Sequence, residues 1–447
     1  MTNDTTTDEP DESTDDRRNE LAAVADRLAD RATTIETTDP TADLTDLEPI
    51  GDALAGARIV GLGEATHGTR EFFRLKHRLV RGLVERQGLR LFAIEANLPE
   101  TLAMNDYVLH GEGTPEEALD GMYFWTWNTE SVVALAKWLR GFNEGRPLDD
   151  RVRFHGIDAQ YTSGAVGRLD AFLATADPDL CAAVDADLAA ADDKGETTEE
   201  HMSAHGPDAT DRLIERLTTA FDERAPAYAA ATSERTTALA RRCLDTIEQA
   251  RARRVAYESE SQEAAMRVRE AAMADNVDWL LDRESSDRLA LWAHDSHLCR
   301  TENHAKRFGA VASLGNRLAD RYGEDYYPLG FDFLGGEFRA IGVRLTEDSE
   351  RATWSLDEPP ADSVTRAFAA IGAELAFLDF GTLDAQERAW FDEPHAKREL
   401  GAVYYGSDGP ADDAADGQAT HNEWRSLTEA FDGLVFVRET TATRPPE

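Results

Sequence analysis

Residues 58–68 read RIVGLGEATHG, a short β-rich apolar run that ends in glycine and a polar loop. Three further apolar runs have the same character, and stretches with helical periodicity separate them: residues 89–94, 152–157 and 289–293. Short apolar strands that alternate with helices are typical of βαβ units. The sequence therefore predicts an α/β fold with a mainly parallel central sheet that is flanked by helices.

A long segment between the third and fourth runs, residues 165–285, is rich in Ala, Arg, Glu and Leu and carries almost no β signal. We interpret it as a large helical insertion, a candidate lid or cap. Residues 1–18 are rich in Thr, Asp and Glu, a composition that predicts a disordered acidic tail. Residues 19–447 are expected to form one domain that carries the insertion.

The formal net charge of −40 is the dominant feature of the composition. Such a chain repels phosphate, which argues against nucleic acids and anionic membranes as partners. Only five lysines are present, and acid excess with scarce lysine resembles the proteins of salt-accumulating halophiles. There is no apolar run of about 18 residues, and the first residues lack the pattern of a signal peptide. We therefore expect a cytoplasmic protein.

Polar residues follow each of the four apolar runs. In open α/β sheets, ligands bind at the carboxyl ends of the strands. Carboxylate and imidazole groups are those that titrate usefully near neutrality when their surroundings are adjusted. We therefore expect one active site in which such groups gather around a bound water: Glu64, His67, Glu95, Asp158, His294 and His297.

Lys76 adds an independent signal. It follows Phe72 by four residues and precedes Leu79 by three, which places it on the apolar face of a predicted helix. Burying an unpaired ammonium group is costly, so we expect Lys76 to contact a carboxylate, either Glu64 or Glu95. The alternative is that its charged end reaches solvent at the edge of the apolar face.

Four blocks in this order, GLGEATHGTREFF, LFAIEA, HGID and WAHDSH, carry a resemblance to a known family. The chain resembles the erythromycin esterase family, which includes proteins named for succinoglycan biosynthesis. The likeness extends over residues 50–345, and no motif of the family is recognised in the C-terminal hundred residues. It implies a hydrolase that cleaves an ester or lactone, with an antibiotic-resistance role in some relatives, and it does not specify the substrate.

The resemblance also implies roles for individual residues. His67 would be the general base that activates water, Glu64 would orient it, and Lys76 would be their electrostatic partner. The rest of the expected catalytic set is Glu95, His294 and His297, whereas Asp158 and Arg269 match recurrent positions that we group with substrate binding. No GxSxG elbow is present in a strand–turn–helix setting, which favours direct attack by water over a serine acyl-enzyme.

Trp125 and Trp127 belong to an aromatic cluster that is either core packing or an apolar wall for a bulky substrate. No cofactor is expected. Histidine and glutamate side chains are also ligands for Zn²⁺ or Mn²⁺, so a metal-dependent hydrolase stays open as an alternative. A non-catalytic protein that binds a ligand in the same cleft is a second alternative. The expected partner is a small-molecule ester or lactone.

Overall fold

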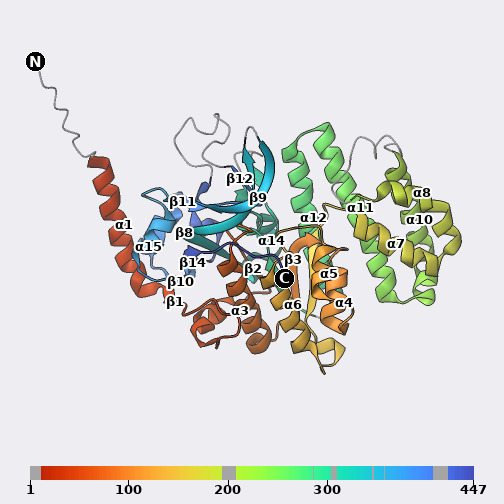
Figure 1. The fold of residues 1–447 in the computed structure, drawn as a ribbon, viewed down its shortest axis with the longest axis horizontal. Helices are drawn as coiled ribbons and strands as arrows, with labels where there is room; N and C mark the ends of the chain where they lie inside the picture. The colour runs from red at the N-terminus through yellow and green to blue at the C-terminus, as the bar shows by residue number, and fades with distance from the viewer. Residues whose placement is uncertain are drawn as a thin grey trace, which may run out of the picture. The chain divides into compact units, whose positions relative to one another are not determined.

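The computed structural model describes residues 12–193, 208–284, 286–303, 310–344, 347–356, 358–405 and 421–446 (Figure 1). The chain divides into two compact units. We call residues 57–61, 83–326 and 444–447 the parallel-strand unit, and residues 1–56, 62–82 and 327–443 the mixed-strand unit.

The four predicted runs form the strands of the parallel-strand unit. They are β2 (Ile59–Leu62), β3 (Leu91–Asn97), β4 (Arg153–Asp158) and β5 (Leu289–Trp292), in the order β2-β5-β3-β4. β3 pairs in parallel with both β4 and β5. Every residue of the four strands is buried, as expected for parallel strands that are covered on both faces.

Helices follow these strands in the chain. α4 (Leu102–His110), α5 (Pro115–Asp120) and α6 (Glu130–Asn143) follow β3. The predicted helical insertion is confirmed as α7 (Ser163–Ala176), α8 (Pro178–Ala191), α10 (Asp208–Ala231), α11 (Glu234–Ser259) and α12 (Gln262–Arg283). Shorter elements follow β5: α13 (Asp295–Leu298), β6 (Glu302–Asn303), β7 (Val311–Ala312) and α14 (Leu314–Tyr322).

The insertion has two structural parts. Helices α7, α8, α10 and α11 share a core of their own, in which Phe172 stacks on Phe221 at 5.6 Å between ring centroids. Helix α12 instead buries Met273 and Val277 in the same cluster as Leu291 of β5. The last helix of the predicted insertion therefore covers the strands and is part of the α/β core.

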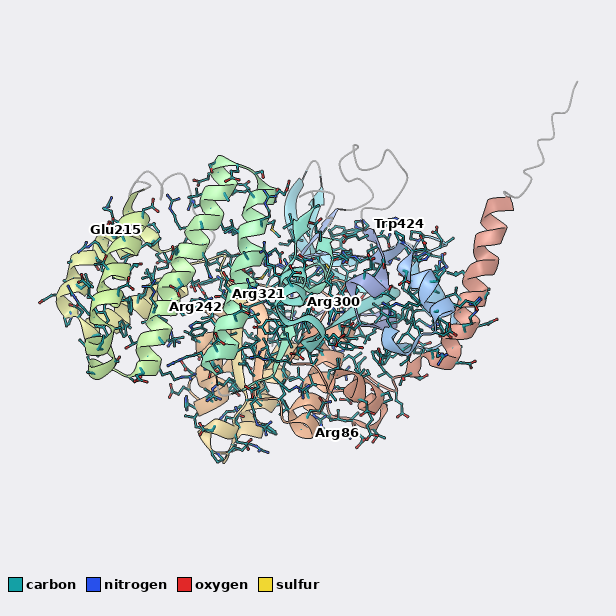
Figure 2. The ribbon with its side chains drawn as sticks, turned by 180° about the vertical axis from the view of Figure 1, so that it is seen from behind. Arg86, Glu215, Arg242, Arg300, Arg321 and Trp424 are labelled. Atoms are coloured by element: carbon teal, nitrogen blue, oxygen red, sulfur yellow. The ribbon has the colours of Figure 1, made fainter. Side chains whose placement is uncertain are left out.

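Arginine side chains tie the neighbouring helices to α12 (Figure 2). Arg242 of α11 donates a hydrogen bond to Asn276. Arg321 of α14 contacts Asp278 at 2.5 Å and Asp275 at 2.9 Å. These contacts fix the helix that carries Arg269, a predicted site residue.

The mixed-strand unit contains β1 (Thr33–Thr34), β10 (Leu375–Asp379), β14 (Gly433–Thr440) and β8 (Tyr326–Arg344), in that order. β14 and β8 are parallel, whereas β10 is antiparallel to both of its neighbours. β9 (Glu347–Ser355) and β12 (Val403–Tyr405) also pair with β8. The sheet is thus mixed in this unit. An apolar run in the sequence predicts a strand but not the direction of that strand, so the antiparallel pairing of β10 could not be predicted.

The helices of this unit are α1 (Glu12–Arg31), α2 (Glu48–Leu54), α3 (Arg70–Gln87), α15 (Val364–Ala370), α16 (Ala385–Asp392) and α17 (Leu427–Ala430). A separate ladder joins β11 (His395–Arg398) to β13 (Asn422–Arg425). Helix α1 begins inside the predicted tail of residues 1–18, because the acidic residues at its start favour a helix N-terminus. Residues 1–11 of that tail lie outside the described residues. Within the described part of the chain, no helix is both long and apolar enough to cross a membrane.

Candidate active site

The loop after β2 is held by main-chain hydrogen bonds within the mixed-strand unit. Gly63 N donates to Leu329 O at 2.9 Å, and Arg339 N donates to Gly68 O at 3.0 Å. At Gly68, a Cβ atom would lie 1.9 Å from Arg339 O, so only glycine fits this close approach. The backbone on either side of Glu64 and His67 is therefore fixed by its neighbours.

Glu64, His67 and Lys76 form one group in this unit, which we call the dyad group. Glu64 Oε1 lies 2.6 Å from His67 Nδ1, and Glu64 Oε2 accepts from Lys76 Nζ at 2.5 Å. Both Glu64 and Lys76 are completely buried, whereas His67 retains 9% of its surface. Each carboxylate oxygen of Glu64 thus has its own partner.

The electrostatics of the dyad group favour a charged carboxylate. Burial raises the pKa of Glu64, but Lys76 and His67 outweigh it and hold the pKa at about 2. A carboxylate at Nδ1 stabilises the imidazole tautomer that carries its proton on Nδ1. Nε2 of neutral His67 then bears the lone pair, which is the form that a general base requires.

The predicted contact between Lys76 and a carboxylate is confirmed, and the carboxylate is that of Glu64. The Lys76 ammonium also lies 5.4 Å from the centroid of the Phe331 ring and 5.7 Å from that of Phe73. A buried cation is stabilised by such a combination of ion pair and ring face. Lys76 therefore acts as a fixed positive charge beneath Glu64.

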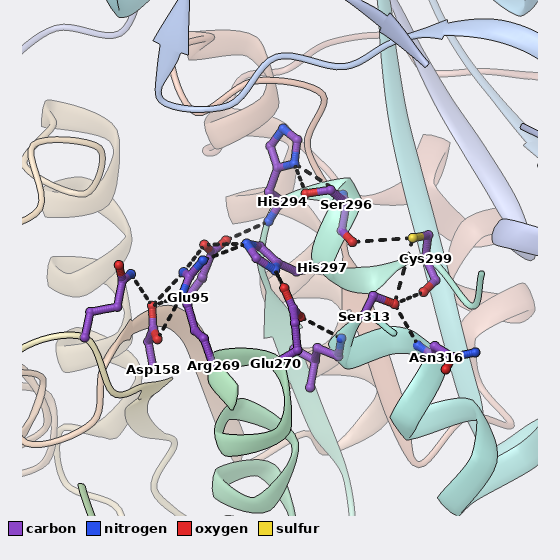
Figure 3. Close-up of polar contacts among 12 residues, drawn as sticks. Glu95, Asp158, Arg269, Glu270, His294, Ser296, His297, Cys299, Ser313 and Asn316 are labelled. Atoms are coloured by element: carbon purple, nitrogen blue, oxygen red, sulfur yellow. Dashed lines mark hydrogen bonds and ion pairs between the residues drawn. The ribbon is translucent and has the colours of Figure 1, made fainter. Parts of the chain in front are cut away.

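A second group lies in the parallel-strand unit around Arg269 of α12, and we call it the arginine group (Figure 3). Arg269 Nη2 lies 2.8 Å from Glu95 Oε1 and 2.7 Å from Asp158 Oδ2. Burial raises the pKa of Asp158, but the Arg269 guanidinium lowers it below its ordinary value. One guanidinium thus joins the ends of strands β3 and β4.

Glu95 lies at an irregularity in the β3–β4 ladder, between Ile94 and Asn97. Irregularities of this kind redirect side chains at the ends of strands. The second oxygen of Glu95 accepts from His294 N at 3.0 Å (Figure 3). Its main-chain carbonyl accepts from the indole N–H of Trp127 at 3.0 Å.

His297 lies between two carboxylates. Its Nδ1 is 2.6 Å from Glu270 Oε1, and its Nε2 is 3.1 Å from Glu95 Oε1. Burial lowers the pKa of His297, but Glu270 and Glu95 outweigh it and raise the pKa to about 10. His297 is therefore an imidazolium at neutral pH and is unsuited to accept a proton there.

His294 has a different hydrogen-bonding state. Its Nδ1 caps helix α13 by accepting from Ser296 N at 3.2 Å, and it also lies 2.8 Å from Ser296 Oγ (Figure 3). An accepting Nδ1 places the proton of a neutral imidazole on Nε2. His294 is thus arranged to donate a hydrogen bond. Because β5 ends at Trp292 and α13 follows, both histidines contribute a contact to Glu95.

The structure brings the predicted residues together in two groups, one within each unit. Sequence reasoning missed Glu270, which joins His297 to the start of α14 by accepting from Leu314 N at 2.7 Å. It also missed Glu100, whose pKa is raised to about 7 by burial although Gly164 N donates to it. The only available signal was an acidic residue on an otherwise apolar face or next to a strand end.

The two tryptophans that were assigned to substrate binding differ in exposure. Trp127 is 1% exposed and packs edge-to-face against Trp292 at 5.5 Å, so it supports the end of β3 from within the core. Trp125 is only partly buried. The neighbouring Tyr123 is 40% exposed and adopts φ +65°, an uncommon conformation for a tyrosine.

A divalent metal would need several carboxylate or imidazole ligands that are not already committed. Among the described residues, no cluster of three His, Cys, Asp or Glu side chains is arranged to hold a metal ion. The carboxylates expected as ligands are instead occupied by cations, Glu64 by Lys76 and Glu95 by Arg269. This donor set does not fit a metal site.

The chain is similar to known proteins over most of its length. An erythromycin esterase type II of Escherichia coli is 24% identical over 393 residues, which cover 82% of this chain and 92% of that protein. A Bacillus cereus protein of known structure superposes with a TM-score of 0.81 at 23% identity, over 96% of this chain and 99% of that one. The structure of a succinoglycan biosynthesis protein superposes with a TM-score of 0.75 at 21% identity, over the same shares of the two chains.

The family model described as erythromycin esterase matches residues 84–440, which is most of the chain. That match supports a hydrolase as the class of enzyme. The chain belongs to the erythromycin esterase family.

Proposed function

We propose that this protein hydrolyses a carboxylic ester or lactone of a small molecule, with a water molecule activated by His67. The observation that carries the proposal is the 2.6 Å contact between Glu64 and His67 Nδ1. It supports the base-competent tautomer of His67, and the buried Lys76 keeps Glu64 charged.

In the proposed step, the water oxygen forms a bond to the acyl carbon while its proton passes to His67 Nε2. The carbonyl oxygen becomes an oxyanion, and Glu64 stabilises the imidazolium through Nδ1–H. When the tetrahedral intermediate collapses, the C–O bond to the alcohol breaks, and the imidazolium returns the proton to the leaving oxygen. Such acid–base catalysis contributes about 10²- to 10⁴-fold to the rate.

We assign the residues of the arginine group by the state of each side chain. His294 is a hydrogen-bond donor, the type of group that stabilises an oxyanion. Glu95, His297 and Arg269 hold one another in an ion network, so they are positioning residues. Asp158 remains a candidate for substrate binding whose contact with Arg269 keeps it charged.

An apolar substrate surface is proposed on a group of partly exposed aromatic rings of the parallel-strand unit. Tyr123 and Phe124 pack against Tyr161 at 6.1 Å and 5.0 Å between ring centroids. Tyr161 follows Asp158 by three residues. Burial raises the pKa of Tyr161, and the negative charge of Asp158 raises it further. These rings and Trp125 would contact a bulky acyl or alcohol group, whereas Trp127 would support them from beneath.

A hydrolysis screen tests the proposal. Simple aryl esters, aliphatic esters and macrocyclic lactones are incubated with the protein, with and without excess chelator. Turnover of at least one class that is unchanged by chelator supports the metal-free mechanism. Loss of turnover in chelator, restored by Zn²⁺ or Mn²⁺, would replace it with the metal-dependent alternative. Binding without turnover across the panel would favour the non-catalytic alternative.

The same screen tests the arginine group. His294→Gln should lower kcat with little change in KM, because the proposed donation strengthens as the oxyanion forms. His395→Gln is the control, since His395 bonds to main-chain carbonyls outside either group. Equal effects of the two substitutions would remove His294 from the reaction.

A further inference from the structure

A small cavity in the parallel-strand unit lies outside both groups of predicted site residues. Its volume is about 90 Å³, and its wall is formed by α4, β4, α7, α11 and α12. Three arginines from three different helices line it: Arg168, Arg235 and Arg283. In a chain with a net charge of −40, three guanidinium groups around one cavity are unexpected, although the side chains of Arg168 and Arg235 also reach solvent.

Positive charge exceeds negative charge around this cavity. Its described lining contains two carboxylates, Glu284 and Asp106. Glu284 pairs with Arg235 at 2.8 Å and with Arg153, which lies just behind the wall, at 2.7 Å. Asp106 pairs with Arg168 at 3.2 Å.

Arg283 is the arginine that remains. Among the described residues it makes no ion pair with any carboxylate, although it is only partly exposed. Three guanidinium groups of the lining therefore face two carboxylates, and one of these carboxylates, Glu284, also pairs with Arg153 outside the lining. Burial raises the pKa of Glu284, but His155 and Arg235 outweigh it and lower the pKa to about 2. Glu284 is therefore negatively charged, and the lining still carries more positive than negative charge.

His155 provides an independent observation. It projects from β4 into the lining, is 1% exposed, and neither of its ring nitrogens makes a hydrogen bond. Its Nε2 lies 3.3 Å from Glu284 Oε1, which is an ion-pair distance, whereas its Nδ1 faces no partner. Buried polar groups of native proteins are nearly always satisfied, so the Nδ1 of this imidazole points to a missing partner.

Asn105 of α4 adds a donor to the same wall. Its side-chain oxygen accepts from Phe154 N at 3.1 Å, which leaves its amide N–H groups as donors. It is 5% exposed and lines the cavity. The lining thus combines guanidinium, amide and imidazole donors, the set that binds the oxygens of an anion.

We propose that this cavity binds a small inorganic oxyanion of the size and charge of phosphate or sulfate. The anion accepts hydrogen bonds from Arg283, Asn105 and His155 and balances the excess of guanidinium charge. Because its donors come from α4, β4 and α12, the bound anion ties the edge strand to the helices that cover it. The site is separate from the proposed hydrolysis and does not depend on it.

The test measures phosphate binding to the full-length protein by isothermal titration calorimetry and by the thermal unfolding midpoint. Phosphate is varied from about 0.1 to 20 mM while NaCl keeps the ionic strength constant, a range in which general salting-out is small. Arg283→Gln removes one proposed donor without breaking an ion pair. Arg267→Gln is the matched control on the same helix, where the arginine forms an exposed pair with Glu263.

The proposal predicts a saturable rise of the midpoint and one binding event for the wild-type protein and for Arg267→Gln. For Arg283→Gln it predicts affinity about 10- to 100-fold weaker, the usual effect of losing a charged hydrogen bond. His155→Gln should also weaken phosphate binding. If His155→Gln does not fold, the result for Arg283→Gln alone tests the proposal. No saturable response, an equal response of Arg283→Gln, or equal binding of chloride would overturn the proposal.

Discussion

At Glu64, a carboxylate without exposed surface contacts a lysine through one oxygen and an imidazole through the other. Its charge is stable in the core because the ammonium group of Lys76, which is equally buried, pairs with it. In the arginine group, Arg269 and His297 offset the charges of Glu95, Asp158 and Glu270. Individual ion contacts therefore hold Glu64 as a carboxylate and His297 as an imidazolium.

Removing the positive partner of Glu64 should be costly. We expect Lys76→Met to lower the free energy of unfolding by about 3–5 kcal/mol, because it leaves a carboxylate buried without compensation. Lys137→Met is the matched control: Lys137 forms an exposed pair with Glu116, so its loss should leave the free energy of unfolding nearly unchanged. Urea unfolding of both variants measures the difference. Similar losses for the two would show that the Glu64–Lys76 pair does not support the core.

The raised pKa of His297 predicts a pH dependence of stability. Its folded-state pKa of about 10 lies above the ordinary value of 6.5. The stabilisation is therefore complete below pH 6.5 and is lost as the pH rises towards 10. Between these values the free energy of unfolding should fall more steeply for the wild-type protein than for His297→Gln, by at most about 1.4 kcal/mol per pH unit. Parallel curves for the two proteins would contradict the assignment of a buried imidazolium.

At the scale of elements, strands β2 to β5 and the polar positions at their ends were predictable, because apolar runs bounded by glycine and polar residues are local signals. The packing of α12 on the strands was not predictable, because only tertiary contacts place Met273 in the same cluster as Leu291. Glu270 was missed for the same reason, since its partner His297 is 27 residues away. The antiparallel direction of β10 also depends on contacts that its own sequence does not carry.

Two glycines of the mixed-strand unit test the role of the loop after β2. Gly68→Ala should lower both stability and turnover, because its Cβ would meet the main chain of β8. Gly82→Ala lies on helix α3 with no atom within 4 Å of the added Cβ, and should stabilise the protein by about 0.5–1 kcal/mol. Thermal unfolding and ester turnover of the pair provide the measurement. An unaffected Gly68→Ala variant would mean that the loop does not depend on this close approach.

At the scale of the whole molecule, the net charge of −40 is carried by 87 acidic against 47 basic side chains. Many arginines are committed to ion pairs with acidic residues, as at Arg321 and Arg251. The remaining acidic groups repel one another, and salt screens this repulsion over a Debye length of about 10 Å at 0.1 M.

Salt should therefore stabilise the folded protein. We expect the midpoint of thermal unfolding to rise between about 0.05 and 1 M NaCl, with most of the rise at the lower concentrations, where screening changes fastest. Sucrose at matched osmolality is the control, since it stabilises without screening charge. A midpoint of thermal unfolding that does not change with NaCl concentration would show that charge repulsion does not limit stability.

The proposed activation of water by His67 is tested most directly by the ratio of kcat/KM between the wild-type protein and His67→Gln, on the substrate that the hydrolysis screen identifies. A glutamine of similar size cannot accept the proton, so we expect a loss of about 10²-fold or more, with an unchanged urea unfolding curve. A His67→Gln variant that retains turnover within a few-fold of wild type would contradict the assignment of His67 as the base.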